Sequence, residues 1–384
     1  MKILFDIIST QGFKNGAAEY VLRVLSELLA CSDAGVEVVC LYDSQEKFPY
    51  DETSPQALAE RGVVTVDIRK KPLGQLITDE QIDLLFIGIA QRFVKYDYSQ
   101  ITCQCVCVVH DFYDFDLDGI YEYLYRKNFF MWFLKKMIRI RNAITKKKSR
   151  QEFYSFLSRK ENLNLVTVSE FTRASLLNKV VGADSKIEVL YSPEKLSHRD
   201  EQIENGELRA VVQSQQKYFL IVSAGRIVKN AVTAINAFMR YAELYAPDVK
   251  LVTIGYGRRV FANHIDLPFL STSDLEHAYL HCHALLYPSL WEGFGYPPLE
   301  AMKYGKPVVC SNVCSMKEVL GQAPIYFSPF YESDIFAALL RFHQCDYQSL
   351  SEVSLACYQR VSKRQQDDLA RLVNLITRNH KSHL

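Results

Sequence analysis

The chain has 384 residues, of which 48% are hydrophobic and 23% are charged, and its 45 Lys and Arg nearly balance its 44 Asp and Glu. This hydrophobic content excludes a disordered chain, and the balanced charge argues against a protein that binds nucleic acid through a general basic field. The length suffices for two domains with separate cores. No apolar run reaches the roughly 20 residues that span a bilayer, and no signal-peptide core is present, so the sequence predicts a cytoplasmic protein.

Apolar strands alternate with amphipathic helices along most of the chain, which is typical of α/β domains with doubly wound parallel sheets. In the first half we expect a helix over 17–30 and strands at 2–8, 36–42, 63–68, 84–89, 105–110, 165–169 and 186–191. The charged, Gln-rich stretch 196–216 has no sustained period and indicates a linker or a hairpin arm. A second series of strands is then expected at 218–223, 250–255, 284–287, 307–311 and 324–327, followed by a C-terminal helix over about 351–376.

The most informative stretch runs from Tyr287 to Val309. A buried strand is expected to end at Tyr287, a loop with Gly293 and Gly295 follows, and Pro298 stands where the first turn of a helix tolerates a missing N–H. The backbone N–H groups at the start of that helix offer a binding place for an anion such as a diphosphate.

Two carboxylates belong to the same stretch: Glu292 in the loop and Glu300 in the first helical turn. A carboxylate accepts hydrogen bonds through two oxygens and suits a vicinal diol such as a ribose or a sugar. Taken singly, each has another interpretation, in which Glu292 is a solvated loop acid and Glu300 complements the helix dipole.

The stretch PSLWEGFGYPPLEAMKYGKPVV, with seven residues between Glu292 and Glu300, resembles the signature of retaining glycosyltransferases with the GT-B fold, the glycogen-synthase and mannosyltransferase-like group. This resemblance implies two Rossmann-like domains with a cleft between them. Residues 1–195 would bind the acceptor, together with a returning helix at 356–384, and residues 196–355 would bind the nucleotide-sugar donor.

The resemblance extends to SAGRIVKN, where Arg226 and Lys229 match the family's diphosphate-binding cations, although the interval between them is two residues shorter than in the commonest version. A guanidinium can contact phosphate oxygens in a bidentate manner, and a lysine supplies a mobile point charge. In the first domain, Gly16 stands where the family's glycine loop touches the donor phosphate. The resemblance further implies that Leu270 lies where a backbone contact reads the nucleotide base.

The remaining roles also come from the resemblance. Glu292 would orient sugar hydroxyls, His110 would hold the donor sugar or phosphate near the acceptor, and Glu300 would bind the ribose. The loop and helix residues assigned to the donor site are Gly293, Phe294, Gly295 and Leu299. The implied reaction transfers a sugar with retention at the anomeric carbon and needs no metal or other cofactor, because cations of the chain meet the leaving diphosphate. Two alternatives stay open: a sugar-nucleotide epimerase of the same fold, and an inactive nucleotide-sugar-binding partner subunit.

Residues 126–150 contain ten Lys or Arg and no acid. At helical spacing the apolar residues gather on one side and most cations on the other, a pattern that suits an anionic membrane surface. The alternative is a helix packed on the sheet with a basic solvated face. We expect a protein peripherally bound to the inner face of the cytoplasmic membrane, acting on a saccharide acceptor linked to lipid, as in bacterial surface polysaccharide synthesis, and not on nucleic acid.

Overall fold

The computed structural model describes residues 1–12, 14–30, 35–93, 96, 101–112, 151–158, 162–180, 187–197 and 199–378. The chain divides into two compact units, the first formed by Met1–Lys195 with Arg364–Leu384 and the second by Leu196–Lys363. The acceptor and donor roles expected of the two stay predictions.

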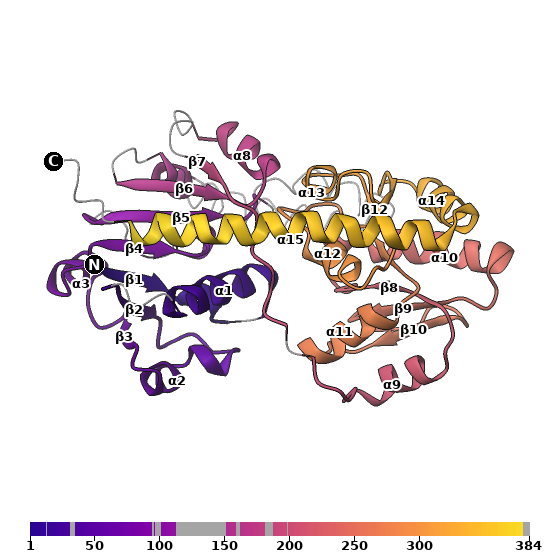
Figure 1. Ribbon diagram of the computed structural model, residues 1–384, viewed down its shortest axis with the longest axis horizontal. Helices are drawn as coiled ribbons and strands as arrows, with labels where there is room; N and C mark the ends of the chain where they lie inside the picture. The colour runs from indigo at the N-terminus through magenta and orange to yellow at the C-terminus, as the bar shows by residue number, and fades with distance from the viewer. Residues whose placement is uncertain are drawn as a thin grey trace, which may run out of the picture. The chain divides into compact units, whose positions relative to one another are not determined.

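The first unit contains a seven-stranded, fully parallel sheet with the order β3-β2-β1-β4-β5-β6-β7 (Figure 1). Its strands are β1 (Lys2–Asp6), β2 (Glu37–Tyr42), β3 (Val64–Asp67), β4 (Leu84–Ile87), β5 (Gln104–Val109), β6 (Leu163–Thr167) and β7 (Ile187–Val189). Its helices are α1 (Gly16–Ala30), α2 (Pro55–Glu60), α3 (Leu73–Asp79), α4 (Ala90–Phe93) and α8 (Glu170–Leu177), with short 3₁₀ turns at Ile8–Thr10 and Asp51–Thr53, and residues 151–157 are also helical.

The sheet of the first unit is covered on both faces, which explains its continuous apolar strands. On one face, Cys105 and Cys107 of β5 belong to the same core cluster as Leu76 of α3 and Leu176 of α8, and neither cysteine forms a disulfide. On the other face, α1 packs so closely that a Cβ on Gly88 would collide with the side chain of Val21.

The second unit contains a six-stranded parallel sheet with the order β10-β9-β8-β11-β12-β13. Its strands are β8 (Tyr218–Ile221), β9 (Lys250–Ile254), β10 (His264–Leu267), β11 (Ala284–Tyr287), β12 (Val308–Ser311) and β13 (Ile325–Phe327). Its helices are α9 (Gly206–Gln213), α10 (Ala231–Tyr245), α11 (Thr272–His281), α12 (Tyr296–Met302), α13 (Met316–Leu320) and α14 (Glu332–Gln344), with a 3₁₀ turn at Ile227–Lys229.

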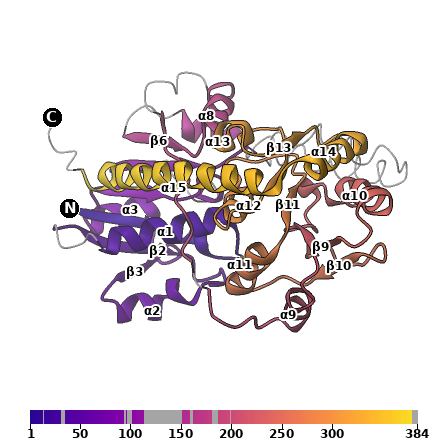
Figure 2. The ribbon, with the colours of Figure 1, turned by 45° about the vertical axis from the view of Figure 1, so that its right-hand side comes forward.

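Aromatic packing fixes two helices on one face of the second sheet. The ring centroid of Phe219 in β8 lies 5.3 Å from that of Phe238 in α10 and 5.0 Å from that of Phe342 in α14. Helix α12 contacts β11 and β12, and α9 lies beside α11 (Figure 2). This packing leaves the loops at the carboxyl ends of the strands to form a site.

One long helix, α15 (Tyr347–Thr377), begins in the second unit and ends in the first. In its first part, the Arg360 guanidinium donates to the Val319 carbonyl of the second unit at 2.9 Å. In its later part, the Asp368 carboxylate accepts from the Tyr191 amide of the first unit, also at 2.9 Å. The division therefore falls at Arg364, later than the expected boundary at residue 356.

The structure corrects two further expectations. Strand β10 was not predicted, because its sequence His-Ile-Asp-Leu alternates polar and apolar residues, as an edge strand paired only with β9 can. Within the expected linker 196–216, residues Gly206–Gln213 form α9, which is capped by the Asn205 side chain and buries Leu208 and Val211. That linker expectation was wrong for these residues, because two buried side chains and one cap suffice for a short helix.

Within the described part of the chain, no helix combines the length and the apolar character needed to cross a bilayer.

Candidate active site

The candidate site lies at the carboxyl ends of β8 and β11, where the strand order of the second sheet reverses. Strands β8 and β11 are neighbours, but the chain continues from β8 to β9 on one side and from β11 to β12 on the other. Their carboxyl-terminal loops diverge there, which is where ligands bind in open α/β sheets. The two loops stay connected by the Leu290 amide, which donates to the Val228 carbonyl at 2.8 Å.

An ion pair between the two loops forms the centre of the site. Lys229 Nζ, after β8, lies 2.5 Å from Glu292 Oε1, after β11, and the two side chains are 9% and 13% exposed. The predicted diphosphate-binding cation and the predicted sugar-orienting acid are thus brought together across 63 residues of sequence.

Two hydroxyls complete the surroundings of this pair. The Tyr287 phenol and the Ser289 hydroxyl each donate to Glu292 Oε1 at 2.5 Å, and Lys229 Nζ also donates to the Tyr287 hydroxyl at 2.7 Å. One carboxylate oxygen therefore accepts three hydrogen bonds. Within the described residues no hydrogen bond reaches the other oxygen, Oε2, which leaves it available to a ligand.

The charges of this cluster are set by opposing effects. Burial raises the pKa of Glu292, but the Lys229 ammonium and the two hydroxyls outweigh it and hold the pKa below the usual carboxyl value. Burial, together with the neighbouring Glu292 charge, raises the pKa of Tyr287 well above that of a free phenol. Glu292 is therefore an anion and Tyr287 a neutral donor at neutral pH.

Arg226 differs from Lys229 in its surroundings. It is exposed, and no described side chain engages its guanidinium. The loop that carries it approaches its neighbour closely, because a Cβ on Gly225 would collide with the Gly255 carbonyl. Arg226 is thus an exposed cation three residues before Lys229 on the same loop, and its contact with phosphate remains a prediction.

The glycine-rich loop ends at Gly295, whose φ of 93° favours glycine and whose Cβ position is filled by Met316. Helix α12 starts directly after it, at Tyr296, so Glu300 lies in the second helical turn. The position of Pro298 had suggested the first turn, and that expectation was wrong because the helix begins two residues before Pro298. Gly293 is buried in the same loop.

The side chains of Phe294 and Leu299 are each 4% exposed and pack inside the second unit. Phe294 packs against the ring of Tyr296, and its carbonyl accepts from the Ser315 hydroxyl at 3.2 Å. Only their backbones are therefore placed to meet a donor. Leu270 is half-buried in the loop after β10, just before Ser271, which caps α11.

Sequence reasoning missed three hydroxyl-bearing residues of this site. Tyr287 and Ser289 flank a proline just before Glu292, and this Tyr-Pro-Ser triplet was the available signal. The third is Tyr279 of α11, whose pKa is raised by burial and by the neighbouring Glu300 carboxylate. Each of the two predicted carboxylates thus has a buried phenol close to it.

In the first unit, His110 follows β5 at the carboxyl edge of the sheet. Its Nε2 lies 3.0 Å from the Gly88 carbonyl, and its ring meets Tyr20 edge-on with centroids 4.8 Å apart. A carbonyl only accepts hydrogen bonds, so Nε2 carries the proton and Nδ1 is left as an acceptor. Burial lowers the pKa of His110 to about 4, and the bond to Gly88 only partly offsets this effect.

This pKa predicts a loss of stability in acid. In the unfolded chain, His110 takes up a proton below about pH 6.5, whereas in the folded protein it does so only below about pH 4. Protonation between these two pH values therefore favours the unfolded state, and folding stability falls as the pH falls through this window. We expect the wild type to lose about 2 kcal/mol more than His110→Asn between pH 7 and pH 4.5. Urea unfolding checks this, with His343→Asn at an exposed position as the control. Equal losses in wild type and His110→Asn would contradict the assignment.

Gly16 begins α1, as the glycine-loop expectation requires. The next two amides, of Ala17 and Ala18, donate to the Asn15 side-chain oxygen at 3.0 and 2.9 Å. These amides are therefore already bound in this structure, and the contact of Gly16 with a donor phosphate stays a prediction.

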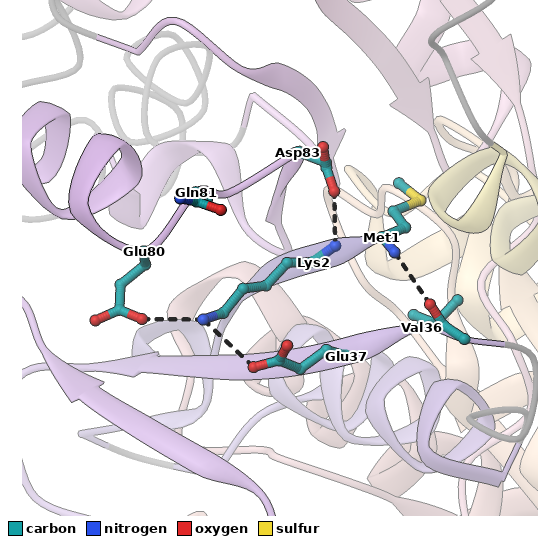
Figure 3. Close-up of a pocket in the computed structure, with 8 residues that line it drawn as sticks. Met1, Lys2, Val36, Glu37, Glu80, Gln81 and Asp83 are labelled. Carbon is teal, nitrogen blue, oxygen red and sulfur yellow. Dashed lines mark hydrogen bonds and ion pairs between the residues drawn. The ribbon is translucent and has the colours of Figure 1, made fainter.

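A hollow of about 610 Å³ lies elsewhere, at the amino edge of the first sheet. Figure 3 shows Lys2 between Glu37 and Glu80, at 3.3 and 3.0 Å from their carboxylates. The Lys2 ammonium in this hollow is thus already paired with two carboxylates of the chain. Because ligands of parallel sheets bind at the carboxyl edge, we do not assign the site to this hollow. The basic segment 126–150 lies outside the described residues.

Residues 204–342 match the family model described as "Glycosyl transferases group 1". This segment of the chain is thus similar to the group 1 glycosyltransferases. The matched segment includes the Lys229–Glu292 pair and every second-unit residue predicted from the sequence, whereas Gly16 and His110 lie outside it.

Two curated proteins are similar to parts of this chain. The chain is 44% identical over 80 residues to O-antigen chain mannosyltransferase B of Escherichia coli, covering 21% of each protein. It is 29% identical over 203 residues to O-antigen chain mannosyltransferase RfbU of Salmonella typhimurium, covering 49% of this chain and 53% of that one. The chain thus spans about half or less of the length of these relatives.

Among solved structures, Anabaena Alr3699/HepE in complex with UDP and glucose aligns with a TM-score of 0.66 at 14% identity, covering 98% of this chain and 99% of that one. At this identity the likeness shows the fold. Two parallel-sheet α/β domains aligned in this way confirm the predicted GT-B fold.

Proposed function

We propose that this chain is a group 1 glycosyltransferase, which moves a sugar from a nucleotide-diphosphate sugar to a hydroxyl of a saccharide acceptor. The observation that carries the proposal is the Lys229–Glu292 pair at the β8/β11 switch point, with Arg226 exposed on the same loop as Lys229. A diphosphate needs cations, and a sugar needs acceptor oxygens, so this small region offers what both halves of a donor require.

In the proposed reaction, the bond between the anomeric carbon and the diphosphate oxygen breaks and a bond to the acceptor oxygen forms. The acceptor hydroxyl approaches the face from which the diphosphate leaves, so the configuration is retained, and its proton passes to the leaving diphosphate. Arg226 and Lys229 stabilise the growing negative charge, which is the role for which preorganised cations are most effective. On this proposal the reaction needs no metal ion.

Two acceptor groups would orient the donor sugar. Glu292 presents Oε2 while its other oxygen is held by three donors. Nδ1 of His110 can only accept a hydrogen bond, so it suits a sugar hydroxyl, which can donate, better than an ionised phosphate oxygen, which cannot. Of the two roles expected from the sequence, we therefore propose the contact with the sugar. Glu300 would accept from the ribose hydroxyls.

The names of the relatives support the biological setting. Both are O-antigen chain mannosyltransferases, so we propose that this chain acts in bacterial surface polysaccharide synthesis on a growing saccharide carried by a lipid. Mannose and glucose nucleotides are the first donors to test, because the solved neighbour binds UDP and glucose.

The test is a thermal-shift panel of UDP, GDP, ADP, CDP and dTDP, and of their sugars, in EDTA, on wild type and Arg226→Ala. A ligand at 100 times its dissociation constant adds about 2.7 kcal/mol of stability, which a melt resolves. We expect one nucleotide to raise the melting temperature without metal and the variant to lose that shift. No shift with any nucleotide contradicts the proposal, and conversion of the sugar nucleotide without an acceptor would instead indicate an epimerase.

Membrane association is proposed from the composition of residues 126–150 alone. With ten cations and no acid, the segment should bind anionic lipid with an affinity that falls as salt rises. We expect the protein to pellet with anionic vesicles and the triple variant Lys135→Glu, Arg139→Glu and Lys146→Glu to pellet at least about tenfold less, since each cation near the surface contributes about 1 kcal/mol. Neutral vesicles are the control, and equal pelleting of variant and wild type would contradict the proposal.

A further inference from the structure

Phe269 is unusual among the phenylalanines that the structure describes. Its side chain is 78% exposed, and no other described phenylalanine is among the exposed large apolar side chains. It lies in the loop after β10, at the carboxyl edge of the second sheet. A single exposed apolar side chain needs no explanation in itself, so its surroundings decide whether it has a role.

The ring is held against the loop after β9. A Cβ on Gly255 would lie 3.0 Å from both Cε1 and Cζ of Phe269, so the ring needs a glycine there to sit where it does. Gly255 has a φ of 75°, and its carbonyl in turn leaves no room for a Cβ on Gly225. Phe269, Gly255 and Gly225 therefore form a continuous contact that ends next to Arg226.

Hydrogen bonds fix the middle of this arrangement. The Asp266 carboxylate accepts from the amides of Tyr256 and Gly257 at 3.0 and 2.6 Å, and the Gly255 amide donates to the Leu267 carbonyl at 2.8 Å. The support beneath the ring is thus ordered by the β9 and β10 strand ends, while the ring itself stays open to solvent.

We propose that Phe269 is the stacking platform for the base of the nucleotide donor. A flat apolar ring stacks on the π-face of any base, and the contact through Gly255 places it within reach of a ligand whose diphosphate lies at Arg226. This inference rests on the proposed function and adds a residue outside those predicted from the sequence. Stacking is tolerant of base identity, so Phe269 contributes affinity, and selection among bases is left to the backbone near Leu270.

The test separates the base from the diphosphate. Calorimetry measures binding of the nucleoside diphosphate found in the thermal-shift panel, and of inorganic pyrophosphate, to wild type, Phe269→Ala and Phe269→Trp. We expect Phe269→Ala to weaken nucleotide binding about 10- to 100-fold and Phe269→Trp to keep it, with pyrophosphate binding equal in all three. Val260→Ala, at another exposed apolar position in the preceding loop, is the matched control and should bind like wild type.

A second readout reports the stack directly. The tryptophan introduced by Phe269→Trp should be quenched by the nucleotide and not by pyrophosphate, beyond the change seen in wild type with its own two tryptophans. Nucleotide binding that Phe269→Ala leaves unchanged, or a loss that pyrophosphate shares equally, overturns the inference while the proposed function stands. A wild type that binds no nucleotide overturns both.

Discussion

Replacing Glu292 by glutamine is expected to lower the turnover number of sugar transfer by about 100- to 1,000-fold, the effect typical of removing one preorganised electrostatic contact to the reacting group. Glutamine keeps the shape of the side chain and an oxygen that can still accept from Tyr287 and Ser289. The substitution removes only the negative charge. That charge stabilises the sugar most strongly in the transition state, when the anomeric carbon becomes cationic. The nucleoside diphosphate should bind at least as tightly as before, because Lys229 is released from its ion pair and can turn to phosphate.

The measurement is steady-state transfer with the donor identified by the nucleotide panel, together with calorimetry of the nucleoside diphosphate. Glu207→Gln, an exposed glutamate of α9 in the same unit, makes the same chemical change away from the site and should leave both values unaltered. Unchanged turnover in Glu292→Gln would contradict the role assigned to Glu292. A loss confined to nucleotide affinity would place the residue at the diphosphate and not at the sugar.

Most of the fold could be predicted because its strands are buried on both faces. Segments such as Leu84–Ile87 and Ala284–Tyr287 are continuous apolar runs, which is the pattern that parallel sheets impose. The misses have the opposite character. Strand β10 lies at an edge and is half polar, and α9 buries only Leu208 and Val211, so neither has a pattern strong enough to distinguish it from a loop.

The site was predictable as a set of residues but not as an arrangement. The motif indicated Lys229 and Glu292 separately, and their pairing depends on β8 and β11 being neighbours, which follows from crossovers that local sequence does not specify. The same holds for Phe294 and Leu299, which belong to the motif yet direct their side chains into the core. Residues of a conspicuous motif therefore divide into those that meet a ligand and those that hold the loop.

Sequence spacing alone could not predict that Tyr287 and Ser289 are the hydroxyl donors to Glu292. Tyr287 ends a strand and Ser289 follows a proline, and both positions are equally compatible with plain packing. Their importance arises because burial makes every unsatisfied lone pair of the carboxylate costly, so the fold supplies donors from whichever residues lie nearest. Three donors on Oε1 then leave Oε2 as the oxygen that a sugar can approach.

Lys229→Met is expected to lower the free energy of unfolding by about 3–5 kcal/mol at pH 7, because it leaves Glu292 as a buried charge without its cation. The sign of the pH dependence follows from the pKa of Glu292. In wild type this pKa is below its usual value, so the pair stabilises the fold above about pH 4.3 and loses that contribution as the pH falls through the folded pKa.

Without Lys229, burial is the largest single effect that remains on Glu292, and we expect it to raise the pKa of this carboxyl in the folded variant. The penalty of the variant is then greatest at pH 7 and shrinks as the pH falls and the folded carboxyl takes up a proton. Urea unfolding without ligand at pH 7 and pH 5 should therefore show a smaller difference between variant and wild type at pH 5.

The double variant Lys229→Met with Glu292→Gln removes both charges and should recover most of the stability lost at pH 7, which measures the coupling between the two side chains. Lys217→Met, at an exposed lysine of the same unit, is the control for losing a cation in general. A double variant as unstable as Lys229→Met, or an equal loss at both pH values, would show that packing and not charge makes Lys229 necessary. Recovery in the double variant would instead establish that the buried carboxylate of Glu292 is tolerated only beside its cation.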